Sequence, residues 1–126
     1  MKLTLAIIAV ALTAGAAQAR DRTVPIVPVT EAPRDCPLTV SFGSYAMGID
    51  GAAFERVTRM LSRDRRVTGI EQFRWGREGE VTLCARTRSK ADARRLSGSV
   101  RALLPKKPRG PVTVTVGGAS FTSPRR

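Results

Sequence analysis

The order of its secondary-structure elements predicts that this chain forms an α+β domain. Four short segments alternate apolar with polar residues, which is the pattern of half-buried strands. Two other segments repeat apolar residues every three or four positions, as amphipathic helices do. From residue 36 onward these segments follow one another in the order β-α-β-β-α-β.

The first strand and first helix have the clearest patterns. Leu38, Val40 and Phe42 alternate with small hydroxyl residues, which predicts a strand over 38–42. After a turn-rich connection, Asp50 is a good N-cap, because its carboxylate can accept hydrogen bonds from free amides of a first helical turn. The apolar residues that follow predict a helix over 51–63.

The second half of the chain supplies the remaining elements. Strands are predicted over 67–75 and 80–86, joined by a hairpin loop with a glycine at each end. Ser89 is the expected N-cap of a second helix, which Pro105 stops. A last strand over 112–116 is expected to end at the following pair of glycines.

With right-handed crossovers, this order most simply gives a ferredoxin-like sandwich. Its sheet would have four antiparallel strands, with both helices on one face. The first and third strands would be neighbours, so Cys36 at the start of one would lie beside Cys84 at the end of the other. We expect one domain over 36–121, an extended proline-rich leader over 20–35 and a basic tail over 122–126.

Residues 1–19 resemble a secretory signal peptide. A positive start is followed by an uncharged apolar run and then by Ala17-Gln18-Ala19, a small-x-small cleavage signal. The run is shorter than the roughly 20 residues that span a bilayer. We therefore expect export to a bacterial periplasm or to the medium, and no membrane-spanning segment.

Cys36 and Cys84 are the only cysteines in the chain. Export would place them in an oxidising compartment, which favours a disulfide. Two free thiols are the alternative. A metal pair is disfavoured, because the chain has no histidine to complete the ligand set. No metal or cofactor is expected.

The chain is strongly basic, with a net charge of +12 from 22 basic and 10 acidic residues. Arginine predominates, and its planar guanidinium suits carboxylates and phosphates. This charge suits anionic partners such as lipopolysaccharide, an acidic glycan, lipid headgroups or nucleic acid, and in an exported protein an envelope component is favoured over nucleic acid. A purely compositional origin of the charge is the alternative.

The predicted first helix carries an arginine ridge. It consists of Arg56, Arg59 and Arg63 on one helix face, with Arg65 and Arg66 just beyond it. The ridge is a candidate docking surface for anions. Positive charge near a helix C-terminus also complements the helix dipole, which would explain the ridge without any ligand.

Phe73 and Trp75 form a second candidate site. Pairing the hairpin symmetrically about its loop sets Trp75 opposite Glu80 and puts both rings on the open face of the sheet, with Ser41 and other hydroxyl residues. Such a face could stack on sugars or bases. A shift of one residue would turn both rings into the core. Val67 is odd-numbered like the two rings, so in a regular strand all three would point to the same face. Because valine favours the core, this pattern favours a core position for the rings.

Enzymatic signals are nearly absent. The chain has neither histidine nor asparagine, which excludes Ser-His and Cys-His catalysis. No phosphate-binding glycine loop appears. Glu78 and Glu80 could act as a carboxylate pair, but two acids in a turn are usually solvated. We therefore expect a non-catalytic protein.

Two segments resemble the SPOR domain, a periplasmic module that binds peptidoglycan. Val40-Ser41-Phe42-Gly43-Ser44-Tyr45 is similar to that family's first-strand motif, and residues 81–96 are similar to its third strand and second helix. The Gly-Pro-Phe of the family is Arg86-Thr87-Arg88 here. The resemblance implies glycan binding on the open sheet face, at Ser41, Phe73 and Trp75.

These observations together predict an exported, non-catalytic module that binds an anionic or glycan component of the cell envelope. An interaction or inhibitor module that pairs with an envelope protein is the first alternative. A small enzyme with carboxylate chemistry is the second.

Overall fold

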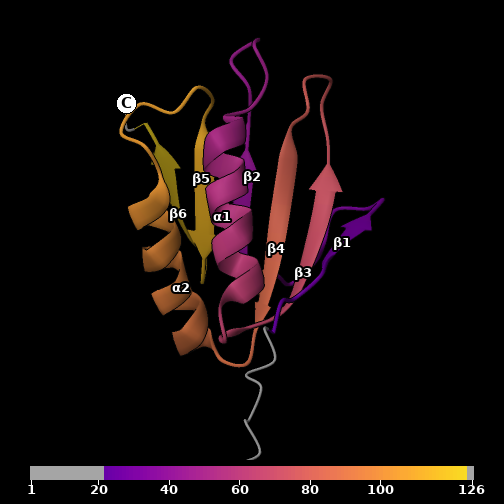
Figure 1. Cartoon of the computed structure of the whole chain (residues 1–126), viewed down its shortest axis with the longest axis vertical. Helices are drawn as coiled ribbons and strands as arrows, with labels where there is room; N and C mark the ends of the chain where they lie inside the picture. Colours follow the sequence, from indigo (N-terminus) through magenta and orange to yellow (C-terminus); the bar gives the residue numbers. More distant parts are fainter. Residues whose placement is uncertain (1–21, 125–126) are drawn as a thin grey trace, which may run out of the picture.

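The computed structural model describes residues 22–124 and shows a six-stranded mixed sheet with two helices on one face (Figure 1). The predicted signal peptide and the last two residues of the basic tail lie outside the described residues. Between residues 22 and 124, no helix is long and apolar enough to cross a membrane. The elements are β1 (Ile26–Val29), β2 (Leu38–Phe42), α1 (Gly51–Arg63), β3 (Val67–Arg74), β4 (Val81–Thr87), α2 (Lys90–Leu103), β5 (Val112–Val116) and β6 (Ala119–Ser123).

The predicted α+β class is correct, but the predicted four-stranded antiparallel sheet is wrong. The four expected strands form the centre of the sheet in the order β3-β4-β2-β5, all antiparallel. A further strand extends the sheet at each edge: β1 pairs with β3 in parallel, and β6 pairs with β5 antiparallel. The result is a mixed sheet of six strands.

The strand β1 lies in the proline-rich leader, where no strand was expected. Proline cannot donate to a strand ladder, so a segment with Pro28 does not suit the middle of a sheet. At an edge this objection is weaker, because only one side of the strand has a partner. The four residues of β1 pair on one side with β3, from Ile26 opposite Ile70 to Val29 opposite Phe73.

The strand β6 follows the glycine pair that was expected to end the sheet. Gly117 and Gly118 have φ angles of 54° and 78°. Two consecutive residues with positive φ form the tight turn that joins hairpin strands most often. The pair therefore reverses the chain and adds a strand, with Val112 opposite Ser123 at the far end of the hairpin.

Both helices cover the same face of the sheet and enclose one apolar core. The core takes alternate residues of the central strands, such as Val40 of β2 and Leu83 of β4, together with Val57 of α1 and Leu96 of α2. Because alternate strand residues point to opposite faces, the remaining residues of these strands lie on the face that no helix covers. The candidate site lies on this uncovered face.

The N-caps of both helices are as predicted. Asp50 caps α1 through the Ala53 amide, which donates to Oδ1 at 3.0 Å, and Ser89 caps α2 through the Asp92 amide at 3.1 Å. The second oxygen of Asp50 accepts from the Arg109 amide at 3.0 Å, so this carboxylate also ties a distant loop to the helix. Burial alone would raise the pKa of Asp50, but these two amides and nearby arginines outweigh it and hold the pKa below its usual value.

Candidate functional site

The uncovered face of the sheet is rich in hydroxyl groups. Two rows of side chains cross it, because residues paired in neighbouring strands point to the same side. We call this surface the hydroxyl face; its hydroxyl residues are Thr39, Ser41, Thr82, Thr113, Thr115, Ser120 and Thr122. Phe73 lies beside Thr82 in the same row and is half-buried.

Trp75 also lies on the hydroxyl face, and its ring is held there by a hydrogen bond. The indole Nε1 donates to the Thr82 hydroxyl at 3.0 Å, and the Thr82 and Ser41 hydroxyls are 2.9 Å apart. The Trp75 side chain remains 41% exposed. The tryptophan is therefore an exposed aromatic surface in a fixed position, next to groups that can donate and accept hydrogen bonds.

The favoured placement of the two rings in the core is wrong. Phe73 pairs with Thr82, and the Trp75 amide donates to the Glu80 carbonyl at 2.9 Å, which is the symmetric hairpin register. Val67 is nevertheless buried, although it shares the sequence parity of Phe73. The register of β3 shifts between Val67 and Gly69, so a bulge there changes the face to which the later odd-numbered residues point.

Four other hydroxyls of this face pair with one another. Thr113 and Thr122 are 3.1 Å apart, and Thr115 and Ser120 are 2.9 Å apart. Each pair joins β5 to β6. A hydroxyl has one donor and two acceptor positions, so paired hydroxyls keep acceptor capacity toward a ligand.

A strap, residues 30–37, crosses part of this face between β1 and β2. The disulfide Cys36–Cys84 fastens it to β4, with a Cα–Cα distance of 5.6 Å. The disulfide was predicted, but Cys84 lies within β4 and not at its end. Because Leu83 and Ala85 belong to the core, Cys84 points to the hydroxyl face.

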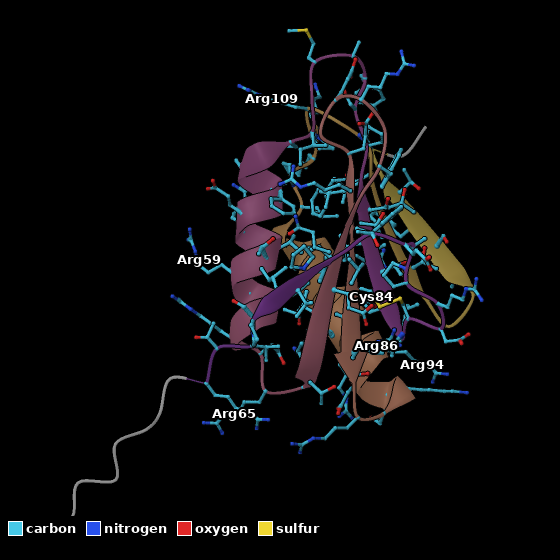
Figure 2. All side chains as sticks on the ribbon, turned by 90° about the vertical axis from the view of Figure 1, so that its right-hand side faces the viewer. Arg59, Arg65, Cys84, Arg86, Arg94 and Arg109 are labelled. Carbon is cyan, nitrogen blue, oxygen red and sulfur yellow. A yellow bond between two sulfur atoms is a disulfide. The ribbon has the colours of Figure 1, made fainter. Side chains whose placement is uncertain are left out.

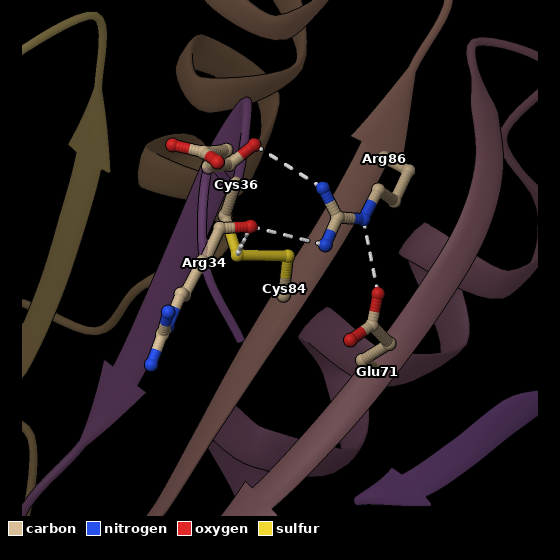
Figure 3. Close-up of a disulfide and its surroundings, with 6 residues drawn as sticks. Arg34, Cys36, Glu71, Cys84 and Arg86 are labelled. Carbon is tan, nitrogen blue, oxygen red and sulfur yellow. Dashed lines mark hydrogen bonds and ion pairs between the residues drawn. A yellow bond between two sulfur atoms is a disulfide. The ribbon is translucent and has the colours of Figure 1, made fainter. Parts of the chain in front are cut away.

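Arg86 forms a second attachment for the strap (Figure 3). Its guanidinium donates to the carbonyls of Arg34 at 3.1 Å and Asp35 at 3.2 Å, and its Nε pairs with Glu71 at 3.0 Å. Arg86 is therefore occupied by the strap and is not free for a ligand. This role of Arg86 was not predicted; the available signal is that Arg86 lies two residues after Cys84 and so on the same face of the strand.

Three members of the arginine ridge lie on the other side of the molecule. Arg56, Arg59 and Arg63 are exposed on α1, and Figure 2 shows Arg59 projecting away from the sheet. The helix separates them from the hydroxyl face. The structure therefore does not bring the two sets of predicted site residues together.

Of the two ridge arginines beyond α1, Arg65 is exposed, whereas Arg66 is engaged within the protein. Its Nε and Nη2 donate to the two oxygens of Asp64 at 2.9 and 2.7 Å, and Nη2 lies 3.3 Å from the Ser99 hydroxyl of α2. This side-chain contact lowers the pKa of Asp64 and raises that of Arg66. Arg66 thus joins the end of α1 to α2.

The two acids of the hairpin loop make hydrogen bonds to loop groups. The Ser44 hydroxyl donates to the Glu78 carboxylate, and the Glu78 amide donates to the Glu80 carboxylate at 2.7 Å. Among residues 22–124, no group of three or more histidine, cysteine, aspartate or glutamate side chains could hold a metal ion.

No family model, no curated protein and no solved structure matches this chain. The resemblance to the SPOR domain therefore stays a prediction.

Proposed function

We propose that this protein is a non-catalytic binding module of the cell envelope, and that its hydroxyl face binds a glycan strand. The position of Trp75 carries the proposal. Its ring is partly exposed on a sheet face, and its indole N–H is bonded to Thr82 within a line of hydroxyl groups.

The chemistry of this face suits a sugar. Pyranose rings have apolar faces that stack on aromatic surfaces, and their hydroxyls need partners of both hydrogen-bonding kinds. An aromatic ring that is already held in place loses little conformational freedom when a ligand stacks on it. Trp75 supplies the aromatic ring. Thr82, which is bonded to the indole, and Ser41, which is bonded to Thr82, supply hydroxyl groups beside it.

Charge has only a secondary role in the proposed binding of a glycan. Arg86, the arginine of the hydroxyl face, is bonded to the strap and to Glu71. The exposed ridge arginines lie on α1 or just after it, so they would add attraction to an anionic envelope without touching the stacked sugar. Retention on the ligand should therefore weaken with salt but persist at an ionic strength that screens surface charges.

Co-sedimentation with purified peptidoglycan sacculi tests this function. We expect Trp75→Ala to lower the affinity about tenfold, in the range found when an aromatic stacking platform is removed from a nucleic-acid site. Tyr45→Ala is the matched control, because Tyr45 is an exposed aromatic residue in a loop and not on the hydroxyl face. Equal retention of the Trp75 variant and wild type would refute the proposal, as would no retention of wild type at any salt.

A second function has support from the edge strand β6. Its residues contain neither proline nor charge, whereas the opposite edge, β1, carries Pro28. An edge strand without such protection is able to pair with a strand of another chain. A partner protein cross-linked from envelope extract, and lost when Thr122 is replaced by proline, would favour this interaction module over the glycan-binding module.

A further inference from the structure

Large exposed apolar side chains gather at one end of the molecule. Within residues 22–124, four such residues are exposed: Val27 on β1, Tyr45 (52%), Met47 (94%) and Trp75 (41%). The last three belong to the β2–α1 connection and the β3–β4 hairpin, which project beyond the same end of the sheet (Figure 1). A side chain as exposed as that of Met47 has no packing role in the isolated domain.

The β2–α1 connection is held in a defined shape. The Ser44 hydroxyl accepts from the Ala46 amide at 3.0 Å and the Gly48 amide at 2.9 Å, and donates to Glu78 of the neighbouring hairpin. Ala46 has a φ of 115°, a conformation that a residue with a side chain adopts only when its surroundings impose it. The exposure of Tyr45 and Met47 is thus built into the fold.

A third loop, between α2 and β5, joins the same end. The Gly43 amide donates to the Pro111 carbonyl at 2.8 Å, and Gly110 packs so closely against the Gly43 backbone that a Cβ there would clash with the Gly43 carbonyl oxygen. We call the three loops, 43–49, 75–80 and 104–111, the loop end.

The loop end has a positive surface. Its exposed basic residues are Arg77, Lys106, Lys107 and Arg109. Its three acids are occupied within the protein: Asp50 borders the loop end and accepts from the Ala53 and Arg109 amides, Glu78 accepts from Ser44, and Glu80 accepts from the Glu78 amide. These carboxylates keep their charge, so the four cations exceed the three acids by one. Three of the cations come from the 104–111 loop, which contains no acid, so an excess of positive charge accompanies the apolar side chains at this end.

We propose that the loop end docks onto the surface of an anionic lipid bilayer. Tryptophan and tyrosine rings favour the headgroup region, where one end of the ring is in apolar surroundings and the other is wet. Met47 would enter the boundary of the acyl chains, and the surrounding cations would face anionic headgroups. This contact uses different residues from the hydroxyl face, apart from Trp75 at their common border.

Vesicle binding by the mature chain tests the proposal, and Trp75 is its natural reporter because it is the only tryptophan. With vesicles of phosphatidylglycerol and phosphatidylcholine, we expect co-sedimentation and a blue shift of the tryptophan emission. With pure phosphatidylcholine we expect neither. Met47→Ser should weaken binding about tenfold, because it removes an apolar side chain that is buried only in the bound state.

A pair of charge variants separates specific docking from attraction by net charge. The double variant Lys106→Gln, Lys107→Gln should lose about 25-fold in affinity, at roughly fivefold for each cation near the surface. Its control, Arg94→Gln with Arg95→Gln, changes the net charge equally but lies in the first turns of α2, at the other end of the molecule (Figure 2). An equal loss in both double variants, an unshifted emission or no vesicle binding would overturn the proposal.

The outcome is separable from that of the glycan proposal. Tyr45→Ala should weaken vesicle binding and leave retention on sacculi unchanged. Ser41→Ala, on the hydroxyl face, should do the reverse. Each proposal therefore has its own measurement, and a negative result for one does not decide the other.

Discussion

Replacing Cys36 and Cys84 together by alanine is expected to lower the free energy of unfolding by about 4 kcal/mol. The disulfide joins residues 48 positions apart, and closing a loop of that length restricts the unfolded chain by about this amount. In a domain of about 100 residues the loss corresponds to a fall of roughly 20 °C in the melting temperature. Alanine is preferred to serine, because Cys84 is fully buried and a hydroxyl there would add a cost of its own.

Chemical denaturation with and without a reductant measures this effect. Reduced wild type should unfold like the double alanine variant, and the reductant should leave the variant itself unchanged. Arg86→Gln is a useful comparison, since it removes the other attachment of the strap and keeps the disulfide; we expect a smaller loss of about 1 to 2 kcal/mol. A melting temperature that reduction does not change would show that the bridge does not form.

Asp50→Ala is expected to lower the free energy of unfolding by about 2 to 4 kcal/mol at neutral pH. The residue is 7% exposed, and each of its oxygens accepts a backbone amide, one from α1 and one from the loop before β5. Loss of an N-cap costs about 1 kcal/mol, and an unpaired buried donor costs a similar amount or more. Asparagine has only one acceptor oxygen, so Asp50→Asn should recover part of the loss and not all of it.

The effect of Asp50 depends on pH in a defined direction. Its pKa is lowered in the folded state, so its stabilisation is fully present above the unfolded pKa, near 3.9, and is lost as the pH falls through the folded value. The difference between wild type and Asp50→Ala should therefore shrink below about pH 4. Glu55→Ala, an exposed acid of the same helix, is the control and should change stability by less than about 0.5 kcal/mol. A difference that grows on acidification would contradict this role.

Local patterns in the sequence were sufficient for the central elements and insufficient for the edges. The helix α1 and the strands β2 and β5 begin and end where alternation, caps and helical period indicated. The two edge strands were missed because proline at 28 and paired glycines at 117–118 are signals of irregular structure in isolation. Only their neighbours, β3 and β5, turn these segments into strands.

The positions of the proposed site residues could be predicted only in part. Symmetric pairing of the hairpin gave the correct partner for Phe73, yet a bulge near Gly69 made the parity of Val67 misleading. Which arginines of the ridge are free depends on contacts between residues that are far apart in the sequence. Arg66 is engaged by Asp64 and by Ser99, which is 33 residues away, and sequence spacing does not show such a contact.

The central claim is that ligand binding occurs on the hydroxyl face and not on the arginine ridge. The most direct test is a proton–nitrogen correlation spectrum recorded during titration with soluble peptidoglycan fragments. The single indole N–H of Trp75 gives one resolved peak, and we predict that it shifts together with the amides of Ser41, Thr82 and Thr113. Shifts confined to the amides of α1, with the indole peak unmoved, would contradict the account.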